Sequence, residues 1–274
     1  MKTALVTGAT SGIGLAVARG FYSLGWRVVL VGRRAEACRA AADAIGRQPG
    51  GELVSFYGDL SEKSQTAALC QKIRAYLEAV CRGRLEALIA NAGTLRTRRE
   101  LTREGREAMF ALNCLSGLWL YEGLRPCLEA ASGRVLFTGS MGHRMIRHAR
   151  PGDLCNEKGP YRGLTAYSRT KVGVNWICQA LQAENPALRF YVVDPGFVCT
   201  ELGAKSAHGL LKPLWQLGKV FGISPGKAAG TYLLLCQAAD TPQPFYYKDR
   251  RLKLPSRLSL DAAKASAFLS LCRR

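Results

Sequence analysis

Residues 166 to 171, AYSRTK, place a tyrosine and a lysine four positions apart, at Tyr167 and Lys171. The run that follows, VGVNWICQAL, is studded with apolar residues and is typical of a helix, on which positions i and i+4 share one face. A cation beside a phenol favours loss of the phenolic proton, so this pair could exchange a proton with a substrate oxygen. A lysine stem packed along an ordinary aromatic ring is the alternative.

A glycine-rich segment near the amino end could hold a phosphate group. TGATSGIG (7–14) follows the apolar run TALVT and precedes a helical pattern. Glycines let backbone N–H groups approach a pyrophosphate at the positive end of the next helix. The spacing is Gly-x-x-x-Gly-x-Gly, which differs from the Gly-x-Gly-x-x-Gly fingerprint. We predict a dinucleotide site that includes Gly8, Thr10, Ser11, Gly12, Ile13 and Gly14.

The residues after the second and third apolar runs indicate which dinucleotide is bound. An NAD site needs a carboxylate after the second run, RVVLVG, whereas this chain has Arg33 and Arg34. Arginine favours a 2′-phosphate, so the predicted cofactor is NADP(H). A solvent-facing arginine at a helix start is the alternative. After the third run, ELVSFYG, the acid in Asp59-Leu60 could accept a hydrogen bond from the adenine amino group.

These segments lie within a regular alternation of apolar runs and helical patterns. Six runs are predicted as strands, at 3–7, 27–32, 52–58, 85–93, 134–140 and 188–196. Such alternation predicts a parallel sheet with helices on both faces. The fold class is therefore α/β, a single-domain Rossmann fold over residues 1–274 with a doubly wound sheet of about seven strands. Ligands bind at the carboxyl ends of strands in such sheets.

The composition argues against several other classes of protein. The 274 residues contain no apolar run of about eighteen residues, so none is predicted to span a membrane. Ten scattered cysteines favour free thiols in a reducing compartment over disulfides or a zinc site, which predicts a cytoplasmic protein without a metal. The three histidines, His143, His148 and His208, are not spaced as ligands and receive no role.

The net charge of +19 would attract anions, including a phosphorylated cofactor, nucleic acid or an anionic membrane surface. Arginines cluster at 96–106 and 143–150 without interleaved aromatic residues, so we expect no specific nucleic-acid binding. Peripheral contact with a membrane through this basic surface stays an alternative.

Several motifs together resemble the short-chain dehydrogenase/reductase family. They are TGATSGIG, NAG at 91–93, a serine after the fifth predicted strand, YSRTK and DPGFVCT, in the family's order and across nearly the whole chain. FTGSMGHRM and the tail at 245–274 are similar to the branch that contains retinol dehydrogenases and the WW-domain oxidoreductase. The resemblance implies an oxidoreductase that transfers hydride between NADP(H) and a carbonyl or alcohol.

The resemblance also implies roles for individual residues. Tyr167 would be the general acid/base, Lys171 would hold the nicotinamide ribose, and Ser140, rather than Thr138, would orient the carbonyl. Asn113, in the helix after the fourth strand, would complete a proton relay through water. Further implied cofactor contacts are Asn91, Ala92, Gly93, Tyr167, Lys171, Pro195, Gly196, Val198 and Thr200.

Residues 201–223 mix Leu, Trp and Phe with Lys, and in this fold they would form the substrate lid. An apolar lid indicates an apolar substrate, with plain helix packing as the alternative. The predicted function is that of an NADP(H)-dependent carbonyl reductase or alcohol dehydrogenase, retinol dehydrogenase-like, acting on an apolar aldehyde or ketone. A catalytically silent NADP-binding sensor or scaffold is the alternative. Family members are often dimers or tetramers, so a homo-oligomer is expected.

Overall fold

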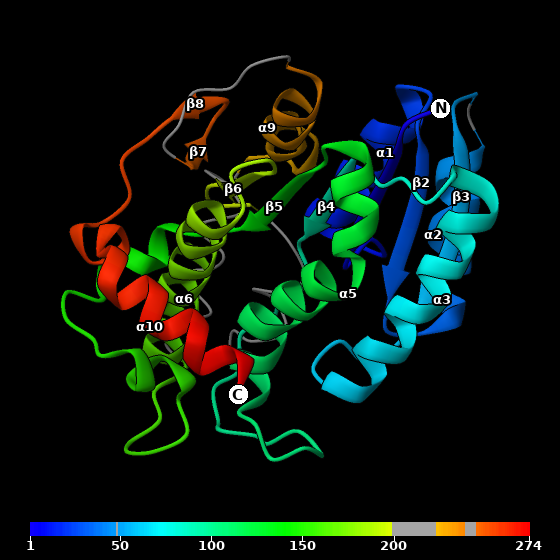
Figure 1. Cartoon of the computed structure of the whole chain (residues 1–274). Coiled ribbons are helices and arrows are strands. Elements are labelled where there is room, and N and C mark those ends of the chain that lie inside the picture. Colours follow the sequence, from blue (N-terminus) through cyan, green and yellow to red (C-terminus); the bar gives the residue numbers. More distant parts are fainter. Residues whose placement is uncertain (48, 199–222, 239–244) are drawn as a thin grey trace.

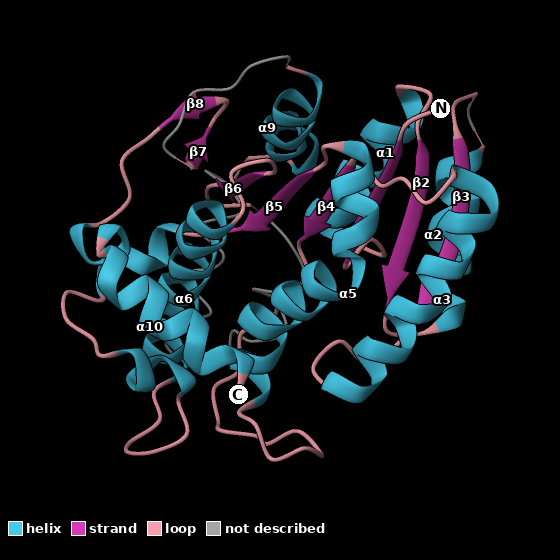
Figure 2. Cartoon of the chain, in the orientation of Figure 1, coloured by secondary structure: helices cyan, strands magenta, loops and turns pink. Residues whose placement is uncertain are grey.

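The computed structural model describes residues 1–47, 49–198, 223–238 and 245–274. In these ranges eight strands form one sheet, in the order β3-β2-β1-β4-β5-β6-β7-β8 (Figures 1 and 2). Neighbouring strands are parallel except for the last pair, β7 and β8. The strands are β1 (Thr3–Thr7), β2 (Arg27–Gly32), β3 (Glu52–Tyr57), β4 (Ala87–Ala90), β5 (Arg134–Thr138), β6 (Arg189–Asp194), β7 (Tyr246–Lys248) and β8 (Arg251–Leu252).

Helices cover both faces of this sheet. The α-helices are α1 (Gly12–Ser23), α2 (Ala35–Gly46), α3 (Lys63–Cys81), α4 (Ala108–Phe110), α5 (Ser116–Ala131), α6 (Gly163–Glu184), α9 (Pro225–Gln237) and α10 (Ala262–Arg273). A π-helical turn, η1 (Ala111–Leu115), joins α4 to α5, and three 3₁₀ turns are η2 (Met141–Met145), η3 (Pro151–Cys155) and η4 (Arg257–Leu260). Figure 1 shows α10 lying against α6.

Two apolar layers explain why the strands are almost continuously apolar. Successive side chains of a strand point to opposite faces. In β1, Leu5 belongs to the layer formed with α3, α5 and α6, whereas Ala4 and Val6 belong to the layer formed with α1 and α9. All five residues of β1 are buried. The predicted α/β doubly wound fold is thereby confirmed, and the sheet has one short antiparallel edge strand more than expected.

Tyr121 on α5 offers a test of the packing in the first layer. Its ring packs edge-on against Phe190 with centroids 5.1 Å apart, and its buried hydroxyl has no hydrogen-bond partner among the described residues. An unsatisfied buried hydroxyl costs about 1–3 kcal/mol, so we expect Tyr121→Phe to keep or raise the free energy of unfolding. Thermal unfolding measures this. A clear fall in the melting temperature would contradict the packing described.

Some sequence predictions concern features beyond the sheet. No helix in the described ranges is both long and apolar enough to cross a bilayer. Among the same residues nine cysteines are free thiols, and no group of three or more His, Cys, Asp or Glu side chains is placed to hold a metal ion. The predicted lid falls, apart from Ile223, outside the described residues, and so does Thr200.

The strand order places the ligand crevice of the sheet. β1 pairs with β2 on one side and with β4 on the other, so the chain reverses direction across the sheet between β1 and β4. In open α/β sheets, ligands bind beyond the carboxyl ends of the strands at such a switch point. The segments that leave β1, β4 and β5 therefore border the crevice in which a ligand is expected.

Candidate active site

Helix α6 brings Tyr167 and Lys171 to the carboxyl edge of the sheet. Lys171 is buried, and its ammonium donates a hydrogen bond of 2.8 Å to the carbonyl oxygen of Thr138 at the end of β5. The same Nζ atom lies 5.4 Å from the centre of the Tyr167 ring. The two side chains therefore lie side by side, as their spacing predicted. Within the described part of the chain the bond to Thr138 is the one hydrogen bond of the Lys171 ammonium, so two of its three protons remain available beside the phenol.

Ser140 borders the same space as Tyr167. It is the N-cap of the turn η2, where its hydroxyl accepts a hydrogen bond of 3.1 Å from the Gly142 amide, and its own proton has no acceptor among the residues that the structure describes. A Cβ atom added to Gly142 would lie 3.5 Å from Ser140 Oγ and 3.5 Å from Tyr167 Cε1. Thr138 turns away, because its hydroxyl lies 2.8 Å from the hydroxyl of buried Tyr232. This arrangement supports Ser140 over Thr138.

Asn113 lies in the π-helical turn η1, where an extra residue per turn is accommodated within an otherwise regular helix. Its amide nitrogen donates to the Thr94 carbonyl at 2.9 Å and to the Thr170 hydroxyl at 3.1 Å, and its amide oxygen accepts from the Thr94 amide at 2.8 Å. Thr170 in turn donates to the Tyr167 carbonyl at 2.7 Å. The asparagine side chain thus ties the loop after β4 to the turn of α6 that carries Tyr167.

The glycine-rich turn after β1 packs too tightly for larger residues. Gly8 and Gly12 have φ angles of +62° and +53°, a region that favours glycine. A Cβ atom on Gly14 would lie 2.2 Å from the Gly8 carbonyl oxygen and 2.6 Å from Asn91 Nδ2. The turn therefore closes directly onto the start of α1 and the loop after β4.

The start of α1 presents hydrogen-bond donors at this edge. The Leu15 amide donates to the Ser11 carbonyl at 3.2 Å, which leaves the amides of Gly12, Ile13 and Gly14 without an intrahelical acceptor. The Ser11 side chain does not cap the helix, and its first turn carries no acidic residue. Three N–H groups that have no partner in the described ranges, at the positive end of a twelve-residue helix, fit a pyrophosphate.

The loops after β2 and β3 lie at the same edge. Arg33 and Arg34 are exposed and make no hydrogen bond or ion pair within the described ranges, so both guanidinium groups are available to an anion. Asp59 accepts from the Ser61 amide at 3.0 Å and from the Ser61 hydroxyl at 2.7 Å, through one carboxylate oxygen. The other oxygen is free of partners among these residues. Leu60, next to it, is buried.

Asn91 has a bracing position at the crevice. Its side chain donates to the Thr7 carbonyl at 3.0 Å and accepts from Thr138 at 3.3 Å, which links the ends of β1, β4 and β5. The Asn91 and Ala92 amides both donate to the Thr7 hydroxyl at 2.9 Å. Gly93 packs closely against the Asn113 side chain, because a Cβ atom added to Gly93 would lie 3.2 Å from Asn113 Oδ1.

The turn after β6 is held by a buried carboxylate. Asp194 accepts from the Gly196 amide at 2.9 Å and from the Tyr246 hydroxyl at 2.8 Å. Gly196 has a φ angle of +75°, and Pro195 before it is buried. Val198 forms an isolated parallel bridge with Ile223. The residues proposed from DPGFV therefore approach the same edge as Ser140.

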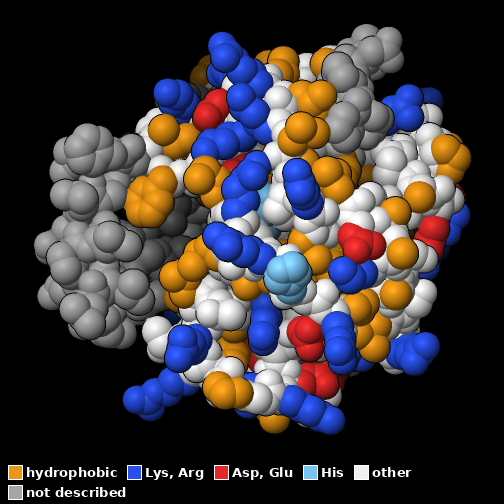
Figure 3. All heavy atoms as spheres, turned by 90° about the vertical axis from the view of Figure 1, so that its left-hand side faces the viewer, with side chains coloured by type: hydrophobic (Ala, Val, Ile, Leu, Met, Phe, Trp, Pro, Cys, Tyr) orange, Lys and Arg blue, Asp and Glu red, His pale blue; other side chains and the backbone are white. Residues whose placement is uncertain are grey.

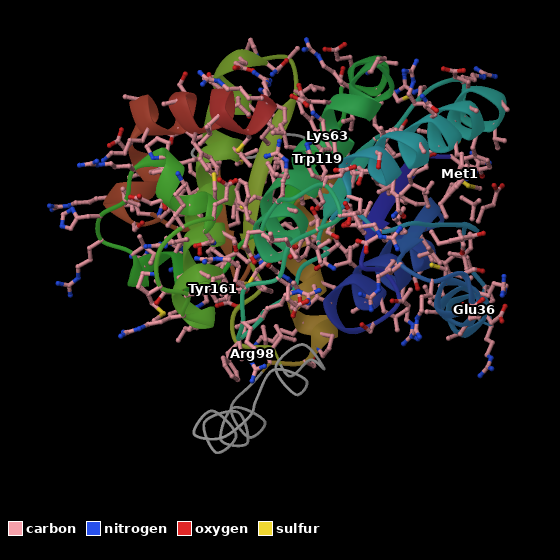
Figure 4. All side chains as sticks on the ribbon, turned by 90° about the horizontal axis from the view of Figure 1, so that it is seen from below. Met1, Glu36, Lys63, Arg98, Trp119 and Tyr161 are labelled. Atoms are coloured by element: carbon pink, nitrogen blue, oxygen red, sulfur yellow. The ribbon has the colours of Figure 1, made fainter. Side chains whose placement is uncertain are left out.

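The arginine cluster at 96–106 is partly structural. Arg99 donates to the carbonyls of Asn156 at 2.9 Å and Gly159 at 2.7 Å, and its guanidinium lies 5.3 Å from the centre of the Tyr161 ring. Arg98 and Tyr161 lie toward the same side in Figure 4. The loop after β4 is thus fastened to the segment before α6. Figure 3 shows further Lys and Arg side chains spread over one face, with few acidic ones between them.

Sequence reasoning gave no role to His143, which the structure places beneath Ser140. The imidazole is fully buried, and its Nδ1 lies 2.6 Å from the Ser140 carbonyl oxygen. Burial lowers the pKa of His143 below its usual value of 6.5. The signal in the sequence is its place three residues after Ser140, since its other hydrogen-bond partner, Ser256, lies 113 residues further along the chain.

Known proteins with similar sequences point to one family. A family model described as short chain dehydrogenase matches residues 2–152. A putative daunorubicin C-13 ketoreductase of a Streptomyces species is 31% identical over 267 residues, which cover 97% of this chain and 89% of the relative. Human retinol dehydrogenase 13 is 28% identical, covering 93% of this chain and 78% of that protein.

Solved structures agree with this similarity. A metagenomic short-chain oxidoreductase in complex with NADP is 28% identical, with a TM-score of 0.66 over 90% of this chain and 96% of that one. An alcohol dehydrogenase from the archaeon Thermococcus sibiricus, complexed with 5-hydroxy-NADP, shares the fold with a TM-score of 0.71 at 23% identity, over 90% of this chain and 95% of that chain. From its matched residues, its fold and these relatives, the chain belongs to the short-chain dehydrogenase/reductase family of oxidoreductases and is similar to the retinol dehydrogenases within it.

Proposed function

We propose that the protein is an NADP(H)-dependent reductase that interconverts a carbonyl and an alcohol, with Tyr167 as the general acid/base. The observation that carries this proposal is the meeting of three side chains at one edge. Lys171 lies beside the Tyr167 ring. A Cβ atom added to Gly142 would lie 3.5 Å from both Tyr167 Cε1 and Ser140 Oγ, so these two side chains border the same space. A sensor or scaffold would need only the half of the site that binds the cofactor.

The residues present fit a bound NADP(H). The free amides of Gly12, Ile13 and Gly14 would hold the pyrophosphate, and Arg33 would bind the 2′-phosphate. Lys171 would donate to the nicotinamide ribose with a proton that Thr138 does not use. When bound, the cofactor supplies the hydride that the reaction transfers.

The protein's own groups would handle the proton and the oxygen charge. In the direction of reduction, Tyr167 gives its phenolic proton to the carbonyl oxygen as that oxygen gains negative charge. The free O–H of Ser140 donates a hydrogen bond to the same oxygen and stabilises the developing charge. The Lys171 ammonium stabilises the phenolate that remains. In the direction of oxidation, the phenolate takes the proton back.

Exposed apolar side chains beside the site support an apolar substrate. Met141 directly follows Ser140 and is 52% exposed, and Phe197 in the turn after β6 is 59% exposed. Large apolar side chains at the mouth of a site favour ligands with apolar surface. We propose an apolar aldehyde or ketone as the substrate class.

Replacing Arg33 with Asp is expected to move the cofactor preference from NADPH toward NADH. A charged hydrogen bond contributes about 1.5–3 kcal/mol, so the ratio of kcat/KM for NADPH over NADH should fall by about 10- to 100-fold. Arg39→Asp, at an exposed position of helix α2, which begins two residues after Arg33, makes the same charge change and serves as control. An unchanged ratio in Arg33→Asp would show that Arg33 does not bind the 2′-phosphate.

The function itself is tested by following NADPH consumption against a panel of aldehydes, ketones and quinones, with NADH in parallel. Turnover of apolar carbonyls with NADPH is the expected result. Tight NADPH binding without turnover of any compound would overturn the reductase proposal in favour of a cofactor-binding sensor.

A further inference from the structure

The turn that carries Ser140 rests on one buried side chain, His143. Its Nδ1 lies 2.6 Å from the carbonyl oxygen of Ser140, and its Nε2 accepts a hydrogen bond of 3.1 Å from the backbone amide of Ser256. Ser140 and Ser256 are 116 positions apart, and the imidazole is the bridge between them. No part of the side chain is exposed to solvent.

The two contacts define the state of the ring. A backbone amide can only donate, so Nε2 must be the acceptor nitrogen. A carbonyl oxygen can only accept, so Nδ1 must carry the proton. Both hydrogen bonds therefore form with one neutral tautomer, and the surroundings specify it. A protonated ring would place a second N–H against the Ser256 amide, donor against donor.

The segment that holds the ring is itself anchored to α6. Just after Ser256, the Leu258 carbonyl accepts from Trp176 Nε1 at 2.8 Å, and the Ser259 hydroxyl accepts from Asn175 Nδ2 at 2.9 Å. Trp176 and Asn175 lie on the same helix as the proposed catalytic tyrosine. The hydrogen bonds through His143 thus connect Ser140 to α6, the helix that positions Tyr167.

A second set of contacts joins this bridge to the turn after β6. The rings of His143 and Tyr246 meet edge to face with centroids 5.1 Å apart. Tyr246 donates its hydroxyl proton to Asp194, which also accepts from the Gly196 amide. The carboxyl-terminal segment therefore supports two walls of the site, the serine turn and the proposed cofactor turn.

We propose that His143 is a positioning residue, which couples the segment around Ser256 to Ser140 and fixes the direction of the serine hydroxyl. This inference rests on the proposed function of Ser140. His143 touches neither substrate nor cofactor, and it acts through the Ser140 carbonyl and the turn η2.

Ser140 supplies its hydrogen bond to the charge that develops during the reaction, so a displaced hydroxyl affects chiefly kcat. A displacement of about 1 Å can cost up to about 10²-fold in rate.

The test separates the two halves of the bridge. The amide of His143→Asn reaches as far as Nδ1 and keeps the donor to Ser140, whereas that of His143→Gln reaches as far as Nε2 and keeps the acceptor for Ser256. We expect His143→Gln to lower kcat by about 10- to 100-fold, with the Kd for NADPH unchanged. His143→Asn should keep more of kcat but speed hydrogen exchange of the Ser256 amide. His148→Asn, an exposed histidine, is the matched control.

A double-mutant cycle distinguishes the inference from the proposed function. If His143 acts through Ser140, then His143→Gln should lower kcat no further in a Ser140→Ala background. Ser140→Ala with wild-type kcat would overturn the proposed role of Ser140. Ser140→Ala with a low kcat, beside folded His143→Gln and His143→Asn variants with wild-type kcat, would overturn the positioning role. A full additional loss in the double variant would also overturn it.

A pH dependence follows from the same bridge. Ser140 before η2, Tyr246 on β7 and Ser256 before η4 contact the ring, and the charges of Arg144 on η2 and Asp194 on β6 act on it with opposite effects. Burial is the largest cause that lowers the pKa of His143 below 6.5, so the unfolded chain takes up this proton first as the pH falls. The stabilisation is therefore complete above pH 6.5 and declines below it.

Melting temperatures of wild type and His143→Gln, measured across this pH range, check the dependence. We expect the advantage of the wild type to be largest at neutral pH and to shrink as the pH falls below 6.5. A difference in melting temperature that stays constant over the same range would show that the neutral imidazole of His143 does not stabilise the fold.

Discussion

Tyr167→Phe is expected to lower kcat for NADPH-dependent carbonyl reduction by about 10²- to 10⁴-fold, the usual contribution of a general acid. The substitution removes one oxygen atom and keeps the ring that lies 5.4 Å from the Lys171 ammonium. The packing around the ring is therefore preserved, and the loss falls on proton transfer. Steady-state kinetics on a substrate found in the panel measures it, with the Kd for NADPH determined in parallel.

Tyr121→Phe is the matched control for this experiment, because it makes the same atomic change at a buried tyrosine of α5. It should leave kcat unchanged. If Tyr167→Phe turned over substrate as fast as Tyr121→Phe, the proton would come from another group and the proposed mechanism would be wrong.

Gly14→Ala is expected to damage both stability and cofactor binding. Its Cβ would meet the Gly8 carbonyl oxygen at 2.2 Å, and backbone cannot rotate away as a side chain can. Overpacking of this kind typically costs about 1–3 kcal/mol in the free energy of unfolding. The turn must also shift away from the amides at the start of α1. Losing one charged hydrogen bond to the pyrophosphate would raise the Kd for NADPH by about 10-fold or more.

Denaturant unfolding and NADPH titration measure these two effects. Gly226→Ala is the control, since nothing lies within 4 Å of its added Cβ and it sits in the first turn of α9. Removing a glycine from a helix typically adds about 0.5–1 kcal/mol of stability. Wild-type affinity and stability in Gly14→Ala would mean that the turn after β1 is looser than its contacts indicate.

The sheet could be predicted because burial on both faces leaves a direct mark in the sequence. The runs at 3–7 and 27–32 match β1 and β2 to the residue. Predicted strands that ran on into turns were too long, as at 85–93, where β4 covers only Ala87–Ala90. β7 was missed, since Tyr246–Lys248 is too short to show a periodic pattern and is defined by its pairing with β6.

The residues of the candidate site also differ in how far local sequence could predict them. Tyr167 and Lys171 are four residues apart on one helix, so local geometry was enough to place them together. Ser140 needed a resemblance to receive a role, and its place at the end of the predicted strand 134–140 favoured it over Thr138, which is the last residue of β5. His143 could not be found, since its second partner, Ser256, is brought to it only by the packing of η4 against α6. Contacts between distant segments leave no local pattern.

Because β7 and η4 come late in the sequence, the ribosome makes them after most of the sheet. Proteins emerge from the ribosome amino end first, and early parts begin to fold while later parts are still being made. The glycine-rich turn after β1 and the helix α6, which carries Tyr167, come out well before Ser256. The nascent chain therefore gains the turn proposed to bind the pyrophosphate first, and the serine turn acquires its support only when the last quarter has been translated.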